Sequence, residues 1–493
     1  MKSIFSFILA AFLMWGLSQS LAFGADVGVE TTAAPAQPRG KYLGFKQCAE
    51  CHAHEEAKPG QVRPIDELGL TDFVSLSEYL PWRAKDKHAQ AYQMLNKDLG
   101  NQIRNVLGIA LGDKNKQCVS CHAPVNNDRP GEDLTFGVTC EGCHGPGSGW
   151  KEPHQNTSWR TKSTAEKQQL GMIDLRDPAA KARQCFSCHI GNPSEGKIVT
   201  HEMYAAGHPP LPSIEIENQL SSMPAHWKDL SRKNETIRRL FHYDPRQMYR
   251  TKSVVLGGVL AYREWLNYLA ARSPAKVQAG WPDFAVFDCY GCHHDLKDPK
   301  IITWRQKRGY DGIAGRPRLA EWPQALVKLA IFHTASGNAE TYNKKYKEFI
   351  SKVERVSYAQ NPKAFPDKKT AMSAAERDAA IGDLIAWLNK LVAEVEASRF
   401  DRDATVRLIK KLTAPEELGT PDFSSARQIA GALASLYADL QSVNEKNGAA
   451  EKLLAELKTM MDLTLPAKRQ TEMSYDPQRF NNQISRLSQL VNR

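Results

Sequence analysis

Ten cysteines and five histidines share one repeated pattern, Cys-x-x-Cys-His, which accounts for every cysteine in the 493-residue chain. Residues i, i+3 and i+4 of a helical turn lie on one face. Two sulfurs can therefore reach the two vinyl groups of one porphyrin while the imidazole points at its iron. The pattern predicts five covalently attached haem c groups, with the histidines as proximal iron ligands. The cysteines are Cys48, Cys51, Cys118, Cys121, Cys140, Cys143, Cys185, Cys188, Cys289 and Cys292, and the histidines are His52, His122, His144, His189 and His293.

Cysteine pairs at this spacing have other known uses. They bind zinc in zinc knuckles and form redox couples in thioredoxin-like proteins. Neither use requires a histidine directly after the second cysteine, whereas a haem iron does. A disulfide between residues i and i+3 would also strain the backbone. Five haems are therefore favoured over zinc and over disulfides.

Nine further histidines are available as second axial ligands. A haem with histidine on both faces is coordinatively closed and suited to electron transfer, whereas an empty face can bind a small molecule. Nine are enough to close all five irons, but spacing does not say which ones do. His333 follows Phe332 in an apolar stretch and is expected to be structural. The candidate distal ligands are His88, His154, His201, His208 and His226. His54 and His294, close to proximal ligands, are expected to contact a haem propionate, with ligation of a neighbouring haem as the alternative, and His242 is unassigned.

The order of the motifs resembles the multihaem cytochrome family typified by the tetrahaem electron acceptor of hydroxylamine oxidoreductase. The resemblance covers roughly residues 40 to 230 and rests on the first site, on Lys87-His-Ala-Gln-Ala-Tyr92, on the second site, on the glycine-rich third site Gly137 to Gly147, and on a fourth site. It implies that His88 serves the fourth haem and His154 the first. It also implies that a histidine after the fourth site, His201 or His208, serves the third haem, and it allows the second haem to lack a distal side chain. The fifth site and the C-terminal part depart from that family.

The N-terminus has the features of an export signal. Lys2 supplies a positive charge, Ile4 to Leu17 an apolar stretch, and Ala22-Phe-Gly24 a small-residue cleavage site. The apolar stretch of about 14 residues is shorter than the roughly 20 that span a bilayer. Cleavage is therefore favoured over an uncleaved anchor. We expect a signal peptide over residues 1–24 and a periplasmic mature protein without a transmembrane anchor.

The expected fold is mainly α. Five sites within 246 residues predict a pentahaem cytochrome domain over residues 25–310, with short helices and long loops packed around porphyrins. Val254 to Ala271 is expected to form an amphipathic helix. Residues 311–493 are expected to form an all-helical C-terminal domain that packs against the haem part, with partner docking as the alternative. Its helix signals are the capping box Ser373-x-x-Glu376 before Ile381, Leu384, Ile385, Leu388, Leu391 and Val395, the stripe Ile429, Leu433, Leu436 and Leu440, and Asp476-Pro477 before Phe480, Ile484, Leu487 and Val491.

Charge decides little about partners. The formal net charge is +10, without a run of like charges typical of a nucleic-acid arm. Five closed haems with ionised propionates would lower the charge of the mature chain to about +4. The sequence therefore predicts an electron carrier between redox proteins, with no nucleic-acid partner. The alternative is a haem enzyme that acts on hydroxylamine, nitric oxide or a similar nitrogen species at an open second haem; catalytic residues are not assigned.

Overall fold

The protein is mainly helical, as expected. The computed structural model describes residues 40–55, 74–109, 116–124, 134–272, 283–289, 293, 318–360, 372–414, 422–442, 448–463 and 475–491. Within these ranges the chain forms helices and two isolated bridges but no strand. Residues Pro38–Arg493 form one compact unit. The predicted signal over residues 1–24 lies outside the described residues, as does the predicted domain boundary near residue 310.

Four of the five Cys-x-x-Cys-His motifs lie on helices that end at the motif histidine. These helices are α1 (Phe45–His52), α4 (Lys116–His122), α5 (Cys140–His144) and α7 (Pro178–His189). Short helices join them: α2 (Tyr79–Lys85), α3 (Asp98–Val106), α6 (Thr164–Gln169), α8 (His201–Ala206), α9 (Ile216–Ser222) and α10 (Glu235–Leu240), with 3-10 segments such as η2 (Lys87–Gln90), η4 (Leu134–Phe136) and η10 (Phe284–Val286). Short helices and long connections were expected here.

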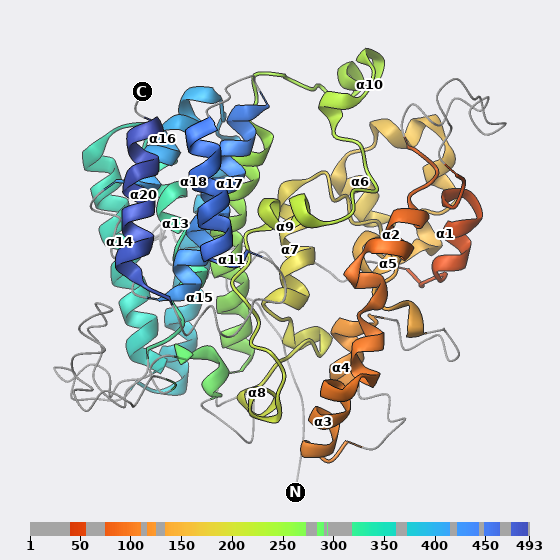
Figure 1. Ribbon diagram of the computed structural model, residues 1–493, viewed down its shortest axis with the longest axis horizontal. Coiled ribbons are helices and arrows are strands. Elements are labelled where there is room, and N and C mark those ends of the chain that lie inside the picture. Colours follow the sequence, from red (N-terminus) through yellow and green to blue (C-terminus); the bar gives the residue numbers. More distant parts are fainter. Residues whose placement is uncertain are drawn as a thin grey trace, which may run out of the picture. The chain divides into compact units, whose positions relative to one another are not determined.

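A long helix, α11 (Tyr249–Ala271), lies between the motif-bearing part and the C-terminal helices (Figure 1). The predicted helix is confirmed, but the prediction that it is amphipathic is wrong, because residues on all sides of α11 are buried. It contacts α7 and α9 as well as α13 (Val327–Thr334), α15 (Ala374–Ala397) and α17 (Phe423–Gln441). A helix surrounded in this way is apolar on every face. Arg263 and Glu264, which suggested a polar side, pair with each other.

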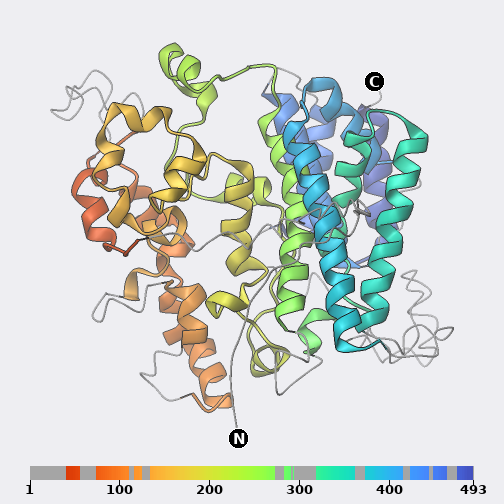
Figure 2. The ribbon, with the colours of Figure 1, turned by 180° about the vertical axis from the view of Figure 1, so that it is seen from behind.

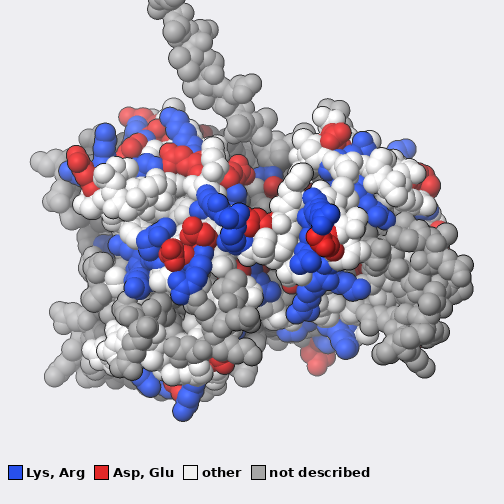
Figure 3. Space-filling view, turned by 90° about the horizontal axis from the view of Figure 1, so that it is seen from above, with Lys and Arg blue, Asp and Glu red and all other residues white. Residues whose placement is uncertain are grey.

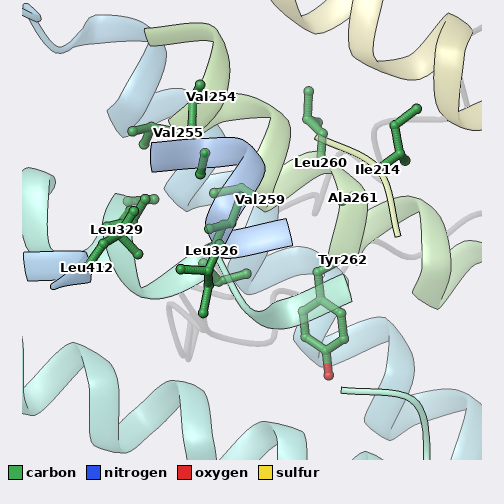
Figure 4. Close-up of a cluster of buried hydrophobic side chains, with 14 of the residues drawn as sticks. Ile214, Val254, Val255, Val259, Leu260, Ala261, Tyr262, Leu326, Leu329 and Leu412 are labelled. Carbon is green, nitrogen blue, oxygen red and sulfur yellow. The ribbon is translucent and has the colours of Figure 1, made fainter. Parts of the chain in front are cut away.

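The C-terminal helices pack around α11. They also include α14 (Ala339–Gln360), α16 (Arg402–Leu412), α18 (Gly448–Met460) and α20 (Pro477–Val491), and the view from behind shows the same grouping (Figure 2). Side chains of α11 meet Leu326, Leu329 and Leu412 in a dense apolar core (Figure 4). The helix signals are confirmed: Ser373 and Glu376 form a capping box, the α17 stripe is buried, and Asp476 accepts backbone N–H groups at the start of α20.

Among the described residues, the main apolar core does not extend into residues 40–178, which carry the first three motifs. Its buried members begin at Ala179 on α7 and extend to Leu487 on α20. Residues 40–178 instead contain an aromatic cluster, in which Phe45 packs on Tyr79, Trp82 and Phe136. None of the described helices is both long and apolar enough to cross a membrane.

Candidate haem sites

The motif histidines lie beside the predicted distal histidines in pairs. The ring centroids of His52 and His154 are 6.2 Å apart, and those of His88 and His189 are also 6.2 Å apart. The corresponding distance is 6.4 Å for His122 and His208, and 6.2 Å for His201 and His293. Two imidazoles that bind one metal ion from opposite sides have centroids roughly 6 Å apart, because each metal–nitrogen bond is about 2 Å long and each ring centre lies about 1 Å behind its nitrogen. These spacings fit two axial ligands of one iron.

The remaining motif histidine, His144, has His226 as its neighbour. Burial lowers the pKa of His144 to about 4, and the charge of nearby His226 adds to this effect. The Nδ1 atom of His226 is buried and has no hydrogen-bond partner within the described structure. His226, on the segment between α9 and α10, is therefore the candidate that the structure brings to the third site.

Hydrogen bonds orient several of these rings. The Nδ1 atoms of His122 and His208 lie 2.9 and 2.7 Å from the carbonyl oxygens of Ala91 and Pro209, and that of His154 contacts the carbonyl oxygen of Lys151. A carbonyl oxygen only accepts, so these imidazoles donate from Nδ1 and keep the Nε2 lone pair for a metal. Metal-binding histidines are oriented in this way. The residues present fit the haem that their motifs imply.

Two sites use a carboxylate in place of the carbonyl. The Nδ1 atom of His52 lies 2.9 Å from Oε2 of Glu78, and that of His88 lies 3.0 Å from Oδ1 of Asp86. Burial opposes protonation of His88, but the hydrogen bond to Asp86 and the negative charge of Asp86 together outweigh it and raise the pKa of His88. Burial lowers the pKa of His189, on the other side of the same site, to about 4. A hydrogen bond from a ligating imidazole to a carboxylate makes the ligand more basic.

Contacts between cysteines show which sites are neighbours. The neighbouring Cys140 thiol and burial raise the pKa of the Cys48 thiol. In the same way, the neighbouring Cys188 thiol and burial raise the pKa of the Cys121 thiol. Burial and the nearby Cys185 and Cys188 raise the pKa of Cys143 to about 12. The first site therefore adjoins the third, the third adjoins the fourth, and the fourth adjoins the second.

Glu141, between the two cysteines of the third motif, explains the contact between the first and third sites. Its buried carboxylate accepts N–H groups from Leu43, Gly44 and Gly147, at 2.8, 2.7 and 2.6 Å. Leu43 and Gly44 immediately precede α1, so Glu141 anchors the first motif beside the third. The sequence analysis missed this residue because the motif permits any side chain at that position.

Gly137 allows the segment before the third motif to approach the fourth site. Its φ is 65°, and a Cβ atom there would lie 2.4 Å from the carbonyl oxygen of His88. The same carbonyl oxygen accepts the N–H of Val138 at 2.9 Å. A larger residue at 137 would separate His88 from its position beside His189.

The pairing agrees with the resemblance at two sites and differs at two others. His88 lies beside the fourth motif and His154 beside the first, as the resemblance implies. His208 lies beside the second motif, for which a missing distal side chain was allowed. Neither His201 nor His208 pairs with His144: His201, at the start of α8, lies beside His293 of the fifth motif, and His208, just after α8, lies beside His122 of the second. Cys292 and His294 lie outside the described residues.

The other histidines lie apart from these pairs. His54 and His242 are exposed. His333 stacks on Phe400 at the edge of the helical core, with 3.9 Å between ring centroids, which fits its expected structural role. Within the described residues, no three His, Cys, Asp or Glu side chains converge as they would around a bare metal ion.

Comparison with protein families gives one match. A family model of cytochrome c554 and c-prime matches residues 76–145. This segment contains His88, Asp86, Glu141 and the second and third motifs. Searches of curated proteins and of solved structures found no match. The family match supports a c-type cytochrome, with covalently bound haem c and a role in electron transport.

Proposed function

We propose that this protein is an exported pentahaem c-type cytochrome that transfers electrons between redox proteins in the periplasm. The observation that carries the proposal is the pairing of imidazoles at the spacing of two axial ligands. The proposed proximal and distal pairs are His52 with His154, His122 with His208, His144 with His226, His189 with His88, and His293 with His201. The ten motif cysteines would hold the porphyrins through thioethers.

The chain's own residues support fast electron transfer. When bound, each haem would supply a one-electron redox centre. Carbonyl and carboxylate acceptors hold the imidazoles in one orientation, so that little reorganisation accompanies a change of charge. The thiol contacts bring neighbouring sites together from the first to the third, fourth and second. Centres in contact are suited to transfer over short distances.

Partners would be recognised through local charge. On the face shown in Figure 3, Lys and Arg side chains are interspersed with Asp and Glu. Local groups of charge can still steer a redox protein of opposite sign. We therefore propose donor and acceptor cytochromes or oxidoreductases as partners, not nucleic acid.

The alternative of a nitrogen-processing haem enzyme finds less support. It required a second haem with an open face. His208 lies beside His122, at the spacing of an axial pair, and its Nδ1 contact with Pro209 leaves Nε2 available. An electron carrier is therefore the better reading of this site.

Spectroscopy on the purified protein tests the proposal. Its intact mass should exceed that of the mature apoprotein by five haems, and electron paramagnetic resonance of the oxidised protein should show only low-spin iron. Replacement of His226 by Ala should convert one haem to high spin, whereas replacement of exposed His242 by Ala should convert none. A colourless protein or fewer than five haems would refute the proposal. A substantial high-spin signal in the unmodified protein that shifts with nitric oxide would favour the enzyme.

A further inference from the structure

The fifth site takes its two histidines from distant parts of the chain. His201 is the first residue of α8, whereas His293 lies 92 positions later and donates its backbone N–H to the carbonyl oxygen of Cys289 at 2.7 Å. The ring of Phe284, on η10, packs edge-on against His201 at 5.7 Å. Something must hold α8 and η10 together for the two imidazoles to meet.

Asp283 joins these segments. It is 7% exposed, and its Oδ1 accepts the N–H of His201 and the N–H of Ala285, both at 3.0 Å. Its Oδ2 pairs with Nη2 of Arg272, just after α11, at 2.8 Å. The first N–H groups of a helix lack a partner within the helix. Asp283 therefore supplies the acceptor for α8 from outside and fixes the backbone of the residue that carries the imidazole.

Helix α11 and the main apolar core hold in place the two segments that Asp283 joins. Tyr268 of α11 donates its hydroxyl to the carbonyl oxygen of Val199, two residues before His201, at 3.2 Å. Val286 and Phe287 are buried in the main core. Asp283 thus connects a rigid helix on one side with α8 on the other.

The same short helix also reaches the second site. Gly207, with a φ of 116°, ends α8 and directs the chain to His208, beside His122. The ring of Tyr204, in the middle of α8, lies 6.3 Å from that of His208. The nearby Cys289 adds to the effect of burial, which raises the pKa of Tyr204 to about 12. The first residue of α8, His201, and a residue just beyond its end, His208, therefore lie beside two different motifs.

We infer that Asp283 is the positioning residue of a fifth haem site, holding His201 opposite His293, and that α8 attaches this site to the second one. The inference rests on the proposed function, because it requires a haem at the fifth motif. The order of neighbouring sites then becomes first, third, fourth, second, fifth. The fifth site lies at the end of the series remote from the first.

Replacement of Asp283 by Ala tests this role in the haem-loaded protein. Loss of the carboxylate leaves two partly buried N–H groups and Arg272 without this acceptor, which releases the start of α8. We expect one haem in five to become high spin, as in H201A, and added imidazole to restore the low-spin signal. Since D283A and H201A affect the same iron, a variant that carries both substitutions should still show one high-spin haem, not two.

Two further variants separate positioning from general destabilisation. Asp401 caps α16 in the helical bundle by accepting the N–H of Ala404 at 2.9 Å, and D401A should leave all haems low spin. D283N keeps an acceptor oxygen and should stay low spin at rest, but its reduced form should bind carbon monoxide at one haem several-fold faster than the unmodified protein. If D283A does not fold well enough to be purified, the carbon monoxide binding rate of D283N tests the role of Asp283 by itself.

The inference is overturned if D283A remains entirely low spin, if D283A and H201A together give two high-spin haems, or if D283N binds carbon monoxide no faster than the unmodified protein. The proposed function fails by a different result. An unmodified protein whose mass shows four haems lacks the fifth site altogether. A mass of five haems with an unaffected D283A variant refutes only the role of Asp283.

Discussion

Residues 40–178 and the helices around α11 are stabilised by different means. The helical part buries a continuous apolar core that includes Leu256, Leu260, Leu266 and many residues of α13 to α20. Among the described residues between 40 and 178, few apolar side chains are buried, namely Phe45, Leu76, Trp82, Ala89, Ala123, Val138, Trp150 and Trp159. They are joined by polar contacts such as those of Glu141. So little apolar burial among these described residues does not by itself offset the conformational entropy lost on folding. Porphyrins at the first three motifs, as proposed above, would supply the rest of the core.

The fourth and fifth sites differ from the first three in their support. Helix α7 places Ala179, Ala182 and Phe186 in the main core beside α11. The fifth site is tied to the same core through Val286 and Phe287. The C-terminal helices therefore have a structural role at these two sites, which favours packing over partner docking among the roles expected from the sequence.

The largest expected effect comes from removing haem attachment at the first three motifs. With Ala at all six of their cysteines, residues 40–178 should lose their protection from hydrogen exchange, because they lack an apolar core of their own. Helices α11, α13, α15 and α17 should remain protected. The unmodified protein is the control, and protection of residues 40–178 that survives the substitutions would contradict the comparison.

A cavity in the helical core should cost more stability than a truncation in the haem region. Leu260 is fully buried, and L260A should lower the free energy of unfolding by about 2–5 kcal/mol. Leu99 on α3 is 45% exposed, and L99A should change it by no more than about 0.5 kcal/mol. Denaturant unfolding followed by circular dichroism measures both. Equal losses in the free energy of unfolding for L260A and L99A would show that the two regions do not differ in how much stability their apolar side chains contribute.

Removal of the Glu141 carboxylate should destabilise the haem region. E141A leaves three backbone N–H groups without their acceptor and should lower the free energy of unfolding by about 2–4 kcal/mol. The exposed carboxylate of Glu50 contacts Lys151 and Gln47 at the surface, so E50A should change the free energy of unfolding by no more than about 0.5 kcal/mol. Denaturation monitored by haem absorbance distinguishes them. If E141A destabilised only the C-terminal helices and left the haem absorbance transition unchanged, Glu141 would not stabilise the haem region.

The helical part should respond to pH through Glu215. Burial raises the pKa of Glu215, which accepts the Ser435 hydroxyl on α17 at 2.6 Å, to about 7. The folded protein then keeps a proton that the unfolded chain releases above about pH 4.5, so stability falls as pH rises from there through 7. The expected loss is about 2–3 kcal/mol. Urea unfolding at pH 5 and pH 8 should show it, and E215Q should remove most of the difference. An unchanged pH dependence in E215Q would exclude this residue as the cause.

The smallest expected effect concerns redox tuning at the first site. E78Q replaces a carboxylate 2.9 Å from Nδ1 of His52 with a neutral amide. The imidazole becomes a weaker donor to ferric iron, so the potential of one haem should rise, by an amount on the order of tens of millivolts. Potentiometric titration resolves this shift, with E50Q as the control. A potential that falls or stays constant would show that the carboxylate does not tune the site.

Much of the helical part is predictable from the sequence because its signals are local. A capping box such as Ser373 to Glu376 and a stripe such as that of α17 depend on residues within a few turns. The prediction that α11 is amphipathic failed because its burial on all sides depends on helices elsewhere in the chain, α7 and α9 before it and α13, α15 and α17 after it. Two charged residues in an apolar stretch suggest a solvent-exposed face of the helix. Arg263 and Glu264 instead form an ion pair with each other.

The sequence by itself determined the five Cys-x-x-Cys-His motifs and the haem attachment that they predict, since cysteine spacing and an adjacent histidine are properties of a single helical turn. It also supplied the candidate distal histidines. Only the tertiary structure decided their partners, because each pair joins segments separated by tens of residues, and small local features govern the approach. Glu141 anchors the first motif beside the third, and Gly137 lets His88 lie beside the fourth. The short helix α8 separates His201, beside the fifth motif, from His208, beside the second. Such contacts depend on how distant backbones pack, which no short pattern records.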